Sequence, residues 1–258
     1  MKLRTVTWNI GGGKLLQDNA DPTLLASYTK DGIDEIVAHL KSIDPDVITL
    51  QETQRNANND QIAYIAENLG YKYFLHDSTS DSHIDKGHQL GHGIISRYPL
   101  TDHQTGFFDN PRVQVEWEDG SIATSFDKGY TTCRVTAKNT SFSLTTLHLI
   151  PFRRFNIEMD SDLAKSILRN VAETLSSPTR KWIIQGDFNI DSETLKEYMP
   201  ELFEQELDEV SVAEPTTPKN HRYDHVLFRS MTLTSLHINP DVLTDHFPVI
   251  AEFEVSEV

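Results

Sequence analysis

The sequence predicts an α/β fold that forms a single domain over residues 1–258. Short apolar segments typical of β-strands alternate with longer segments in which apolar residues recur at helical spacing. No Pro-, Gly- or Ser-rich linker, break in composition or internal repeat divides the chain. Because a chain of this length can bury a substantial core, one large domain is favoured over two small ones.

The N-terminal half alternates between expected strands and expected helices. The expected strands are residues 3–10, 46–50, 71–75 and 93–100. Apolar side chains at helical spacing predict helices over 33–43 and 62–69. Three glycines at 11–13 match neither of the glycine patterns that bind phosphates, and they predict a turn. The polar segments 14–31 and 77–91 predict loops.

The C-terminal half contains more strands than helices. Expected strands are 113–117 with a turn at Asp119-Gly120, a segment opening at Lys128, and 141–150, 181–189, 221–228, 231–238 and the C-terminal end. Helices are expected over roughly 155–176 and near 193–206. Cys133 lies within an expected strand and is interpreted as a buried apolar residue.

Polar side chains recur at the ends of these strands. Asp187 and Asn189 are two residues apart, so in an extended backbone both point to one face, while Phe188 points into the core. Taken alone, this is also the pattern of an ordinary turn. The recurrence favours a site, and its members are Asn9, Glu52, His148, Asp187, Asn189, Asp224, Asp245 and His246.

The residue types in this set favour metal-assisted hydrolysis. Glu52 and Asp245, with Asn9, supply hard oxygen ligands, which suit Mg²⁺, with Mn²⁺ as a substitute, rather than zinc. Two histidines supply groups that titrate near neutral pH. A Gly-x-Ser-x-Gly nucleophile motif is absent. Attack of water on a phosphate ester is therefore the expected reaction class.

Three further histidines lie in or beside the expected loop 77–91. They are His83, His88 and His92. Because no cysteine accompanies them and their spacing matches no common ligand pattern, a zinc site is not predicted.

Charge and cysteine content restrict the partners. The chain has 39 acidic and 23 basic residues, a net charge of -16, which opposes nonspecific binding to nucleic acid or anionic membranes. A phosphorylated substrate is still compatible, since a bound divalent cation reverses the sign locally. The single cysteine, the absence of a secretory segment and the absence of an apolar run near ~20 residues predict a cytoplasmic protein without stable membrane association. Nothing in the sequence indicates a protein partner.

Seven motifs occur in a characteristic order between residues 8 and 250. They are Trp8-Asn9-Ile10, Gln51-Glu52, Ser96-Arg97-Tyr98-Pro99, Leu147-His148-Leu149, Gly186-Asp187-Phe188-Asn189, Tyr223-Asp224-His225-Val226-Leu227 and Thr244-Asp245-His246-Phe247-Pro248-Val249. In these motifs the sequence resembles the endonuclease/exonuclease/phosphatase superfamily, which has the DNase I-like fold. The resemblance implies a four-layered α/β sandwich, with two mixed β-sheets packed face to face, helices on the outer faces and a site at one edge.

The resemblance also implies roles for the strand-end residues. Glu52 would be the principal Mg²⁺ ligand, assisted by Asn9 and Asp245, and Asp187 would orient or deprotonate the attacking water. Asn189 would hold a phosphoryl oxygen. His246, held in its tautomer by Asp224, would contact the scissile phosphate, and His148 would help to bind the phosphate or protonate the leaving oxygen.

The sequence departs from the secreted nuclease branch of that superfamily at two points. Gln54 occupies the place of an arginine two residues after the glutamate, and no carboxylate is evident that would support His148. Lys128 lies where some branches contact phosphate, with a surface lysine as the alternative. Arg153 and Arg154 would bind a second phosphate or a nucleic-acid backbone, or simply flank a helix start.

The expected function is a Mg²⁺-dependent phosphoesterase, either a phosphodiesterase or nuclease, or a phosphatase. Within it, nucleic acid competes as the substrate with a small phosphoester such as an inositol phosphate, a nucleotide or a phospholipid headgroup. The alternative outside this class is a non-catalytic binding module with the same fold.

Overall fold

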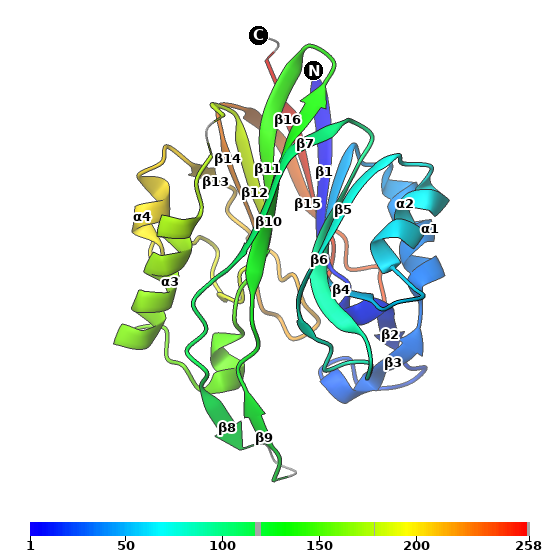
Figure 1. Cartoon of the computed structure of the whole chain (residues 1–258), viewed down its shortest axis with the longest axis vertical. Coiled ribbons are helices and arrows are strands. Elements are labelled where there is room, and N and C mark those ends of the chain that lie inside the picture. The colour runs from blue at the N-terminus through cyan, green and yellow to red at the C-terminus, as the bar shows by residue number, and fades with distance from the viewer. Residues whose placement is uncertain (117–119, 178, 257–258) are drawn as a thin grey trace.

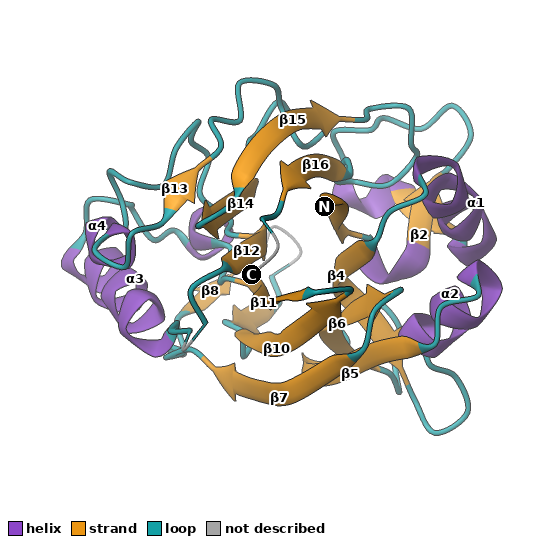
Figure 2. Ribbon diagram, turned by 90° about the horizontal axis from the view of Figure 1, so that it is seen from above, coloured by secondary structure: helices purple, strands orange, loops and turns teal. Residues whose placement is uncertain are grey.

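The computed structural model describes residues 1–116, 120–177 and 179–256 of the chain. Two six-stranded β-sheets pack face to face, and helices cover the outer face of each sheet (Figures 1 and 2). This arrangement confirms the predicted four-layered α/β sandwich. Trp117 and Asp119, which were expected to end a strand and begin a turn, lie outside the described residues.

The first sheet has the strand order β15-β16-β1-β4-β6-β5. Its strands are β1 (Lys2–Asn9), β4 (Val47–Arg55), β5 (Tyr73–Asp81), β6 (Gln89–Ser96), β15 (Thr232–Ile238) and β16 (Val249–Glu254). The neighbours β1 and β4 are parallel, whereas β16 pairs with β1 in the antiparallel sense. Helices α1 (Ile33–Ile43) and α2 (Gln61–Leu69) cover the outer face of this sheet (right in Figure 2).

The second sheet has the strand order β13-β14-β12-β11-β10-β7. Its strands are β7 (Leu100–Phe107), β10 (Gly129–Ala137), β11 (Thr140–His148), β12 (Trp182–Asp187), β13 (Asp208–Glu209) and β14 (Asp224–Arg229). Here β11 and β12 are the parallel pair, and β14 runs antiparallel to β12. Helices α3 (Asp162–Thr174) and α4 (Pro200–Phe203) lie outside it (left in Figure 2).

Two short hairpins and three 3-10 turns extend the sandwich at its lower end in Figure 1. The hairpins pair β2 (Lys14–Leu16) with β3 (Tyr28–Asp31), and β8 (Gln114–Glu116) with β9 (Ile122–Thr124). The 3-10 turns are Gly11–Gly13, Leu25–Ser27 and Phe152–Phe155.

Three buried apolar clusters fill the three interfaces between the four layers. Phe142, Val226 and Phe253 are among the residues packed between the two sheets. A second cluster joins the first sheet to α1 and α2, and a third joins the second sheet to α3 and α4. Burial of apolar side chains from strands and helices of matching periodicity therefore explains the layered fold.

Buried glutamines connect the sheets close to their shared edge. The Gln51 amide donates to Thr146 Oγ1 across the interface at 2.9 Å, and the Gln185 amide donates to Thr49 Oγ1 at 3.0 Å. Because a buried amide without a partner is costly, these bonds fix the relative position of the two sheets. One of these glutamines, Gln51, directly precedes the predicted site residue Glu52 in β4.

Several predicted boundaries were wrong. The segment 14–31 contains the β2–β3 hairpin, and the loop 77–91 shortens to 82–88 because β5 and β6 extend into it. The helix near 193–206 is limited to α4, and α3 begins only at Asp162, where the Ser161 hydroxyl caps it by accepting from the Ala164 N–H. Cys133 is buried, as expected. Within the described residues, no helix has the length and apolar character needed to cross a membrane.

Candidate active site

A cleft of about 580 Å³ lies where strand ends from both sheets meet. These strand ends lie toward the lower edge of the sandwich in Figure 1. The parallel pairs β1/β4 and β11/β12 bring their carboxyl ends to this edge, and β14 begins there. Asp224 lies behind the lining, against His246. The predicted residues that line the cleft are Asn9, Glu52, His148, Arg154, Asp187, Asn189, Asp245 and His246.

Asp187 ends β12 at the centre of these groups. Gly186 permits the close pairing with β11, because a Cβ atom there would lie 2.2 Å from the Leu147 carbonyl oxygen. The Asp187 carboxylate accepts from Asn9 Nδ2 at 2.9 Å and from the Asn189 N–H at 2.9 Å. Burial raises the pKa of Asp187 to about 7, against the opposing charge of His246. Asp187 is therefore a stronger base than an exposed carboxylate.

His246 is held by a buried carboxylate. Its Nδ1 lies 2.8 Å from Asp224 Oδ2, and its Nε2 lies 3.8 Å from Asp187 Oδ2. Burial alone would lower the pKa of His246, but the negative charges of Asp224 and Asp187 outweigh it and hold this pKa well above its usual value. His246 therefore presents a positively charged imidazole to the cleft.

His148, at the end of β11, has a different neighbour. Lys128 Nζ lies 3.0 Å from His148 Nδ1, and His148 Nε2 lies 3.3 Å from Asp187 Oδ2. Burial, together with the positive charge of Lys128, lowers the pKa of His148 well below its usual value. The alternative of a surface lysine was wrong, because Lys128 is buried. His148 is therefore a neutral imidazole beside the amino group of Lys128.

Glu52 projects from a β-bulge rather than from a strand end. The pairing of β4 with β6 shifts between Gln51 and Thr53, and Glu52 has a φ of +51°. Its Oε1 lies 3.8 Å from Lys128 Nζ. Burial opposes ionisation of Glu52, but the charges of Lys128 and His83 outweigh it and lower the pKa. The bulge therefore turns an ionised carboxylate into the cleft.

Glu52, Asp245 and Asn9 have the composition of a site for a hard divalent cation. Asp245 Oδ1 is buried and has no hydrogen-bond partner in the described part of the chain, which is costly for a carboxylate unless a cation meets it. Burial raises the pKa of Asp245 to about 6, and the charge of Glu52 adds to that shift. Asn9 Oδ1 accepts from the Gly11 N–H at 3.0 Å and keeps a second lone pair. These residues therefore fit Mg²⁺ or Mn²⁺.

A second group of ligand atoms lies close by. Asp187, Asp224 and His246 each offer one atom, and the three atoms lie within 4.8 Å of one another. The hydrogen bond between Asp224 and His246 accounts for the closeness of those two residues. The raised pKa of His246 also disfavours metal binding by this group, since a metal needs a deprotonated ring nitrogen.

The two neighbouring arginines face different cavities. Arg154 lines the cleft, whereas Arg153 lines an adjacent cavity of about 360 Å³ that includes Tyr223. Arg153 Nη1 lies 3.2 Å from His221 Nε2. The two side chains therefore do not form one basic patch. Of the two arginines, Arg154 is the one placed to meet a group bound beside Glu52.

Other cleft residues were not predicted. The 3-10 turn and the β2–β3 hairpin contribute Gly11, Leu25 and Tyr28, and the loop between β5 and β6 contributes His83 and Ile84. These residues come from segments without regular periodicity, so no sequence pattern pointed to their position. The sequence draws attention to His83 only as one of three histidines in or beside a loop, for which no zinc site is predicted.

Comparison with known proteins agrees with the observed fold. The model of the Endonuclease/Exonuclease/phosphatase family matches residues 6–246. An endonuclease/exonuclease/phosphatase from Beutenbergia cavernae DSM 12333 has a similar structure, with a TM-score of 0.72 and 20% identity, and the match covers 99% of this chain and 72% of that one. No curated protein matches the chain.

Two further similar structures are phosphatases of different substrates. ANGEL2, a 2',3'-cyclic phosphatase, matches with a TM-score of 0.63 and 16% identity over 98% of this chain and 95% of its own. The 3' phosphatase NExo from Neisseria, bound to a product DNA hairpin, matches with a TM-score of 0.61 and 16% identity over 98% of this chain and 99% of its own. At these identities the likeness shows a shared fold.

Proposed function

Because the chain belongs to the endonuclease/exonuclease/phosphatase family, we propose that it is a metal-dependent phosphoesterase that hydrolyses its substrate by in-line attack of water. The observation that carries this proposal is the convergence of three carboxylates and three histidines in one cleft. A non-catalytic binding module would have no need of a carboxylate poised to titrate near neutral pH beside two differently charged histidines.

Asn9, Glu52 and Asp245 would hold the divalent ion, Mg²⁺ or Mn²⁺. When bound, such an ion polarises a phosphoryl oxygen and neutralises developing negative charge. The hydrogen bond between Asp224 and His246, and the raised pKa of His246, support this assignment over the Asp187, Asp224 and His246 group.

Asp187 orients the attacking water and accepts its proton. The hydrogen bonds from Asn9 and from the Asn189 backbone hold the carboxylate in one orientation. The raised pKa of Asp187 brings its basicity close to neutral pH, where a general base is most effective. Asn189 donates one amide hydrogen to the Leu149 carbonyl oxygen at 3.0 Å and keeps a second hydrogen for a phosphoryl oxygen.

The two histidines take different parts in this mechanism. His246, kept cationic by Asp224, contacts the scissile phosphate and stabilises the charge that builds up in the transition state. His148 is neutral and hydrogen-bonds a phosphoryl oxygen or the leaving oxygen, with Lys128 supplying positive charge beside it. Arg154 adds a further cation to the same cleft.

A small phosphoester is the favoured substrate class. The net charge of -16 opposes binding to long nucleic acids, which depends on many Lys and Arg contacts to phosphates. Apolar and aromatic side chains, including Leu25, Tyr28 and Ile84, form part of the cleft wall and suit a compact organic group. A terminal phosphate on a nucleic acid is the second candidate, since NExo is a 3' phosphatase bound to a DNA product.

A parallel substrate panel tests the proposal. Wild-type protein is assayed with Mg²⁺ and with EDTA on nucleotides, inositol phosphates, a phospholipid headgroup, and oligonucleotides with and without a terminal phosphate. We expect metal-dependent turnover, and Asp187→Asn should reduce it about 10³-fold because it removes the general base. Circular dichroism controls for the fold of the variant. Absence of metal-dependent turnover, together with an Asp187→Asn protein that matches wild type, would refute the assignment as a metal-dependent phosphoesterase.

A further inference from the structure

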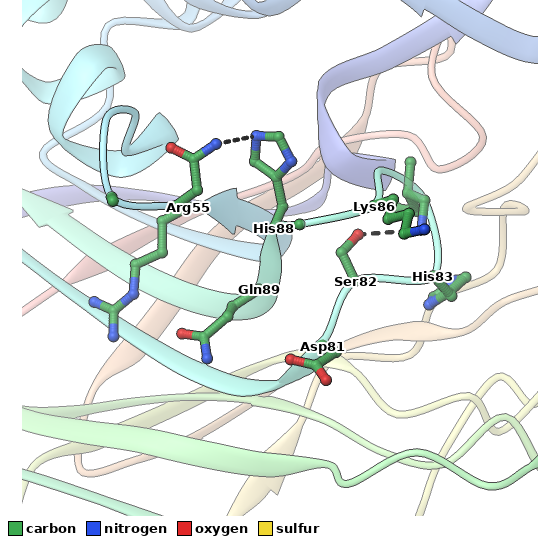
Figure 3. Close-up of a pocket in the computed structure, with 11 residues that line it drawn as sticks. Arg55, Asp81, Ser82, His83, Lys86, His88 and Gln89 are labelled. Carbon is green, nitrogen blue, oxygen red and sulfur yellow. Dashed lines mark hydrogen bonds between the residues drawn. The ribbon is translucent and has the colours of Figure 1, made fainter.

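His83 has an unassigned position inside the cleft. It lies in the loop 82–88 between β5 and β6, and its side chain lines the same cavity as Glu52 and Arg154. Neither ring nitrogen has a hydrogen-bond partner within the described part of the chain. His83 also lines a neighbouring pocket of about 750 Å³, where it lies across from Arg55 (Figure 3). The imidazole is therefore available to a bound molecule.

The loop that carries His83 is fixed to the strand that carries Glu52. The Ser82 hydroxyl donates to Gln54 Oε1 at 2.8 Å, and Gln54 Nε2 donates to Asp85 Oδ2 at 2.9 Å. Ser82 Oγ also accepts from the backbone N–H of Ile84 at 3.1 Å (Figure 3). Gln54 is buried and lies two residues after Glu52. The glutamine that stands where the nuclease branch has an arginine thus anchors this loop.

An aromatic contact fixes the ring itself. His83 stacks on Phe126 with ring centroids 4.8 Å apart and planes 13° apart. Phe126 in turn packs edge-on against Phe155, with centroids 6.1 Å apart, and Phe155 is buried. Phe126 precedes Lys128 by two residues. The stack therefore connects a loop of the first sheet to segments attached to the second sheet and fixes the His83 ring where it lines the cleft.

The position of His83 relates to the direction of the reaction. Its loop is anchored through Ser82 to Gln54, two residues after Glu52, and its charged neighbours are Glu52, Lys128 and Arg154, so it lies at the Glu52 end of the cleft. Asp187, which directs the water, contacts Asn9 and His246 instead. His148 lies between the two carboxylates, with its Nε2 3.3 Å from Asp187 Oδ2 and 3.9 Å from Glu52 Oε1. In an in-line displacement the attacking and leaving oxygens lie on opposite sides of phosphorus. The leaving group therefore points away from Asp187.

We propose that His83 is a substrate-binding residue that hydrogen-bonds an oxygen atom on the leaving-group side of the phosphoester. Gln54 and Phe126 are positioning residues that hold its ring at the Glu52 end. The inference rests on the proposed phosphoesterase function and extends it to substrate selection. It predicts a preference for substrates whose leaving group carries a hydrogen-bonding oxygen near the scissile bond, as the hydroxyl-bearing groups of sugars, nucleosides and inositols do.

The test separates hydrogen bonding from packing. His83→Phe keeps an aromatic ring for stacking on Phe126 but removes both nitrogens, and His83→Ala removes both properties. Lys86→Ala, an exposed change in the same loop, is the matched control. Each protein is assayed with Mg²⁺ on a sugar phosphate, a nucleoside monophosphate and p-nitrophenyl phosphate, and its affinity for inorganic phosphate is measured by calorimetry.

We expect His83→Phe to lower kcat/KM for the sugar and nucleoside phosphates about 10- to 100-fold, because an oxygen of the leaving group loses its hydrogen-bond partner inside the cleft. The loss should be several-fold smaller on p-nitrophenyl phosphate, and Lys86→Ala should match wild type. If His83→Phe matches wild type on every substrate while His83→Ala is impaired, the residue only packs and the inference is wrong.

The two proposals fail in different ways. Wild-type protein that binds phosphate but turns over none of the phosphoesters would refute the phosphoesterase function. Weaker phosphate binding in His83→Phe under those conditions would still support His83 as a ligand-binding residue. Unchanged phosphate binding and unchanged turnover in the same variant would reject the inference alone.

Discussion

Two buried histidines flank Asp187, and their neighbours favour different charge states: His246 is cationic and His148 is neutral. His246 is paired with the Asp224 carboxylate, and its pKa is held well above the usual value. His148 is next to the Lys128 ammonium, and burial together with that charge holds its pKa well below the usual value. Since both rings are buried in one cleft, the difference comes from the neighbouring charge rather than from exposure.

This contrast suggests a division of work within the cleft. A cationic imidazole suits the stabilisation of negative charge on a phosphate, whereas a neutral one can donate through one nitrogen and accept through the other. Asp187 lies 3.3 Å from His148 Nε2 and 3.8 Å from His246 Nε2, so it contacts both environments. Replacing the charged neighbour of either histidine should reduce the difference between their pKa values.

Asp224→Asn should have the largest effect on this contrast. The change removes the carboxylate that raises the pKa of His246, so that pKa should fall toward 6.5 and turnover at neutral pH should drop about 10²-fold. NMR titration of the imidazole and steady-state assays measure the two effects. An unchanged His246 titration in a folded Asp224→Asn protein would show that Asp224 does not set the charge.

The same pair gives the stability of the protein a pH dependence. A raised folded-state pKa stabilises the fold fully below the unfolded pKa of about 6.5, and this gain is lost as the pH rises through the raised value. The free energy of unfolding of wild type should therefore exceed that of Asp224→Asn by about 2 kcal/mol near pH 6. Urea unfolding should show this difference shrinking at alkaline pH, and a difference that grows there would contradict the assignment.

Lys128→Met should raise a histidine pKa, whereas Asp224→Asn lowers one, and its effect on turnover should be smaller. Removal of the ammonium should raise the pKa of both His148 and Glu52, because its positive charge lowers both. We expect turnover to fall about tenfold, the loss of one charged contact near the reacting phosphate. Lys128→Arg is the control, because it keeps the positive charge and changes only the shape of the side chain. A His148 titration that moves downward in Lys128→Met would contradict this account.

The smallest effect is expected at the neighbouring arginines. Arg154→Ala should raise KM about 3- to 10-fold because it removes a partly exposed cation from the cleft, whereas Arg153→Ala should leave KM within about twofold of wild type. Steady-state kinetics on one small phosphoester compares the two variants directly. Equal losses in both would mean that the adjacent cavity lined by Arg153 also holds part of the substrate.

The sequence contained enough information for the layered fold and for the residues at strand ends. Asn9, His148 and Asp187 end parallel strands, and strands that pair in parallel bring such residues to one edge. Glu52 was expected at a strand end and instead lies in a bulge, because periodicity does not reveal one extra residue in a ladder. The outcome is the same, since both arrangements turn the carboxylate into the cleft.

The loop residues of the cleft could not be predicted. His83 lines the same cleft as Glu52 because Gln54 anchors its loop and Phe126, from a segment over 40 positions later, stacks on its ring. Lys128 is buried against His148 because β10 pairs with β11. A lysine side chain is usually exposed, so its burial could not be expected from its residue type. Contacts of this kind depend on tertiary packing between distant segments.

The central claim is that the cleft binds a divalent ion through Asn9, Glu52 and Asp245, apart from the charged His246. Calorimetric titration of Mg²⁺ into wild type, Glu52→Ala and His246→Ala, with turnover measured on the same preparations, tests it most directly. We predict that Glu52→Ala weakens Mg²⁺ binding at least tenfold, whereas His246→Ala binds Mg²⁺ with nearly wild-type affinity and has lost turnover. Loss of Mg²⁺ binding in His246→Ala, or unchanged binding in Glu52→Ala, would contradict the account.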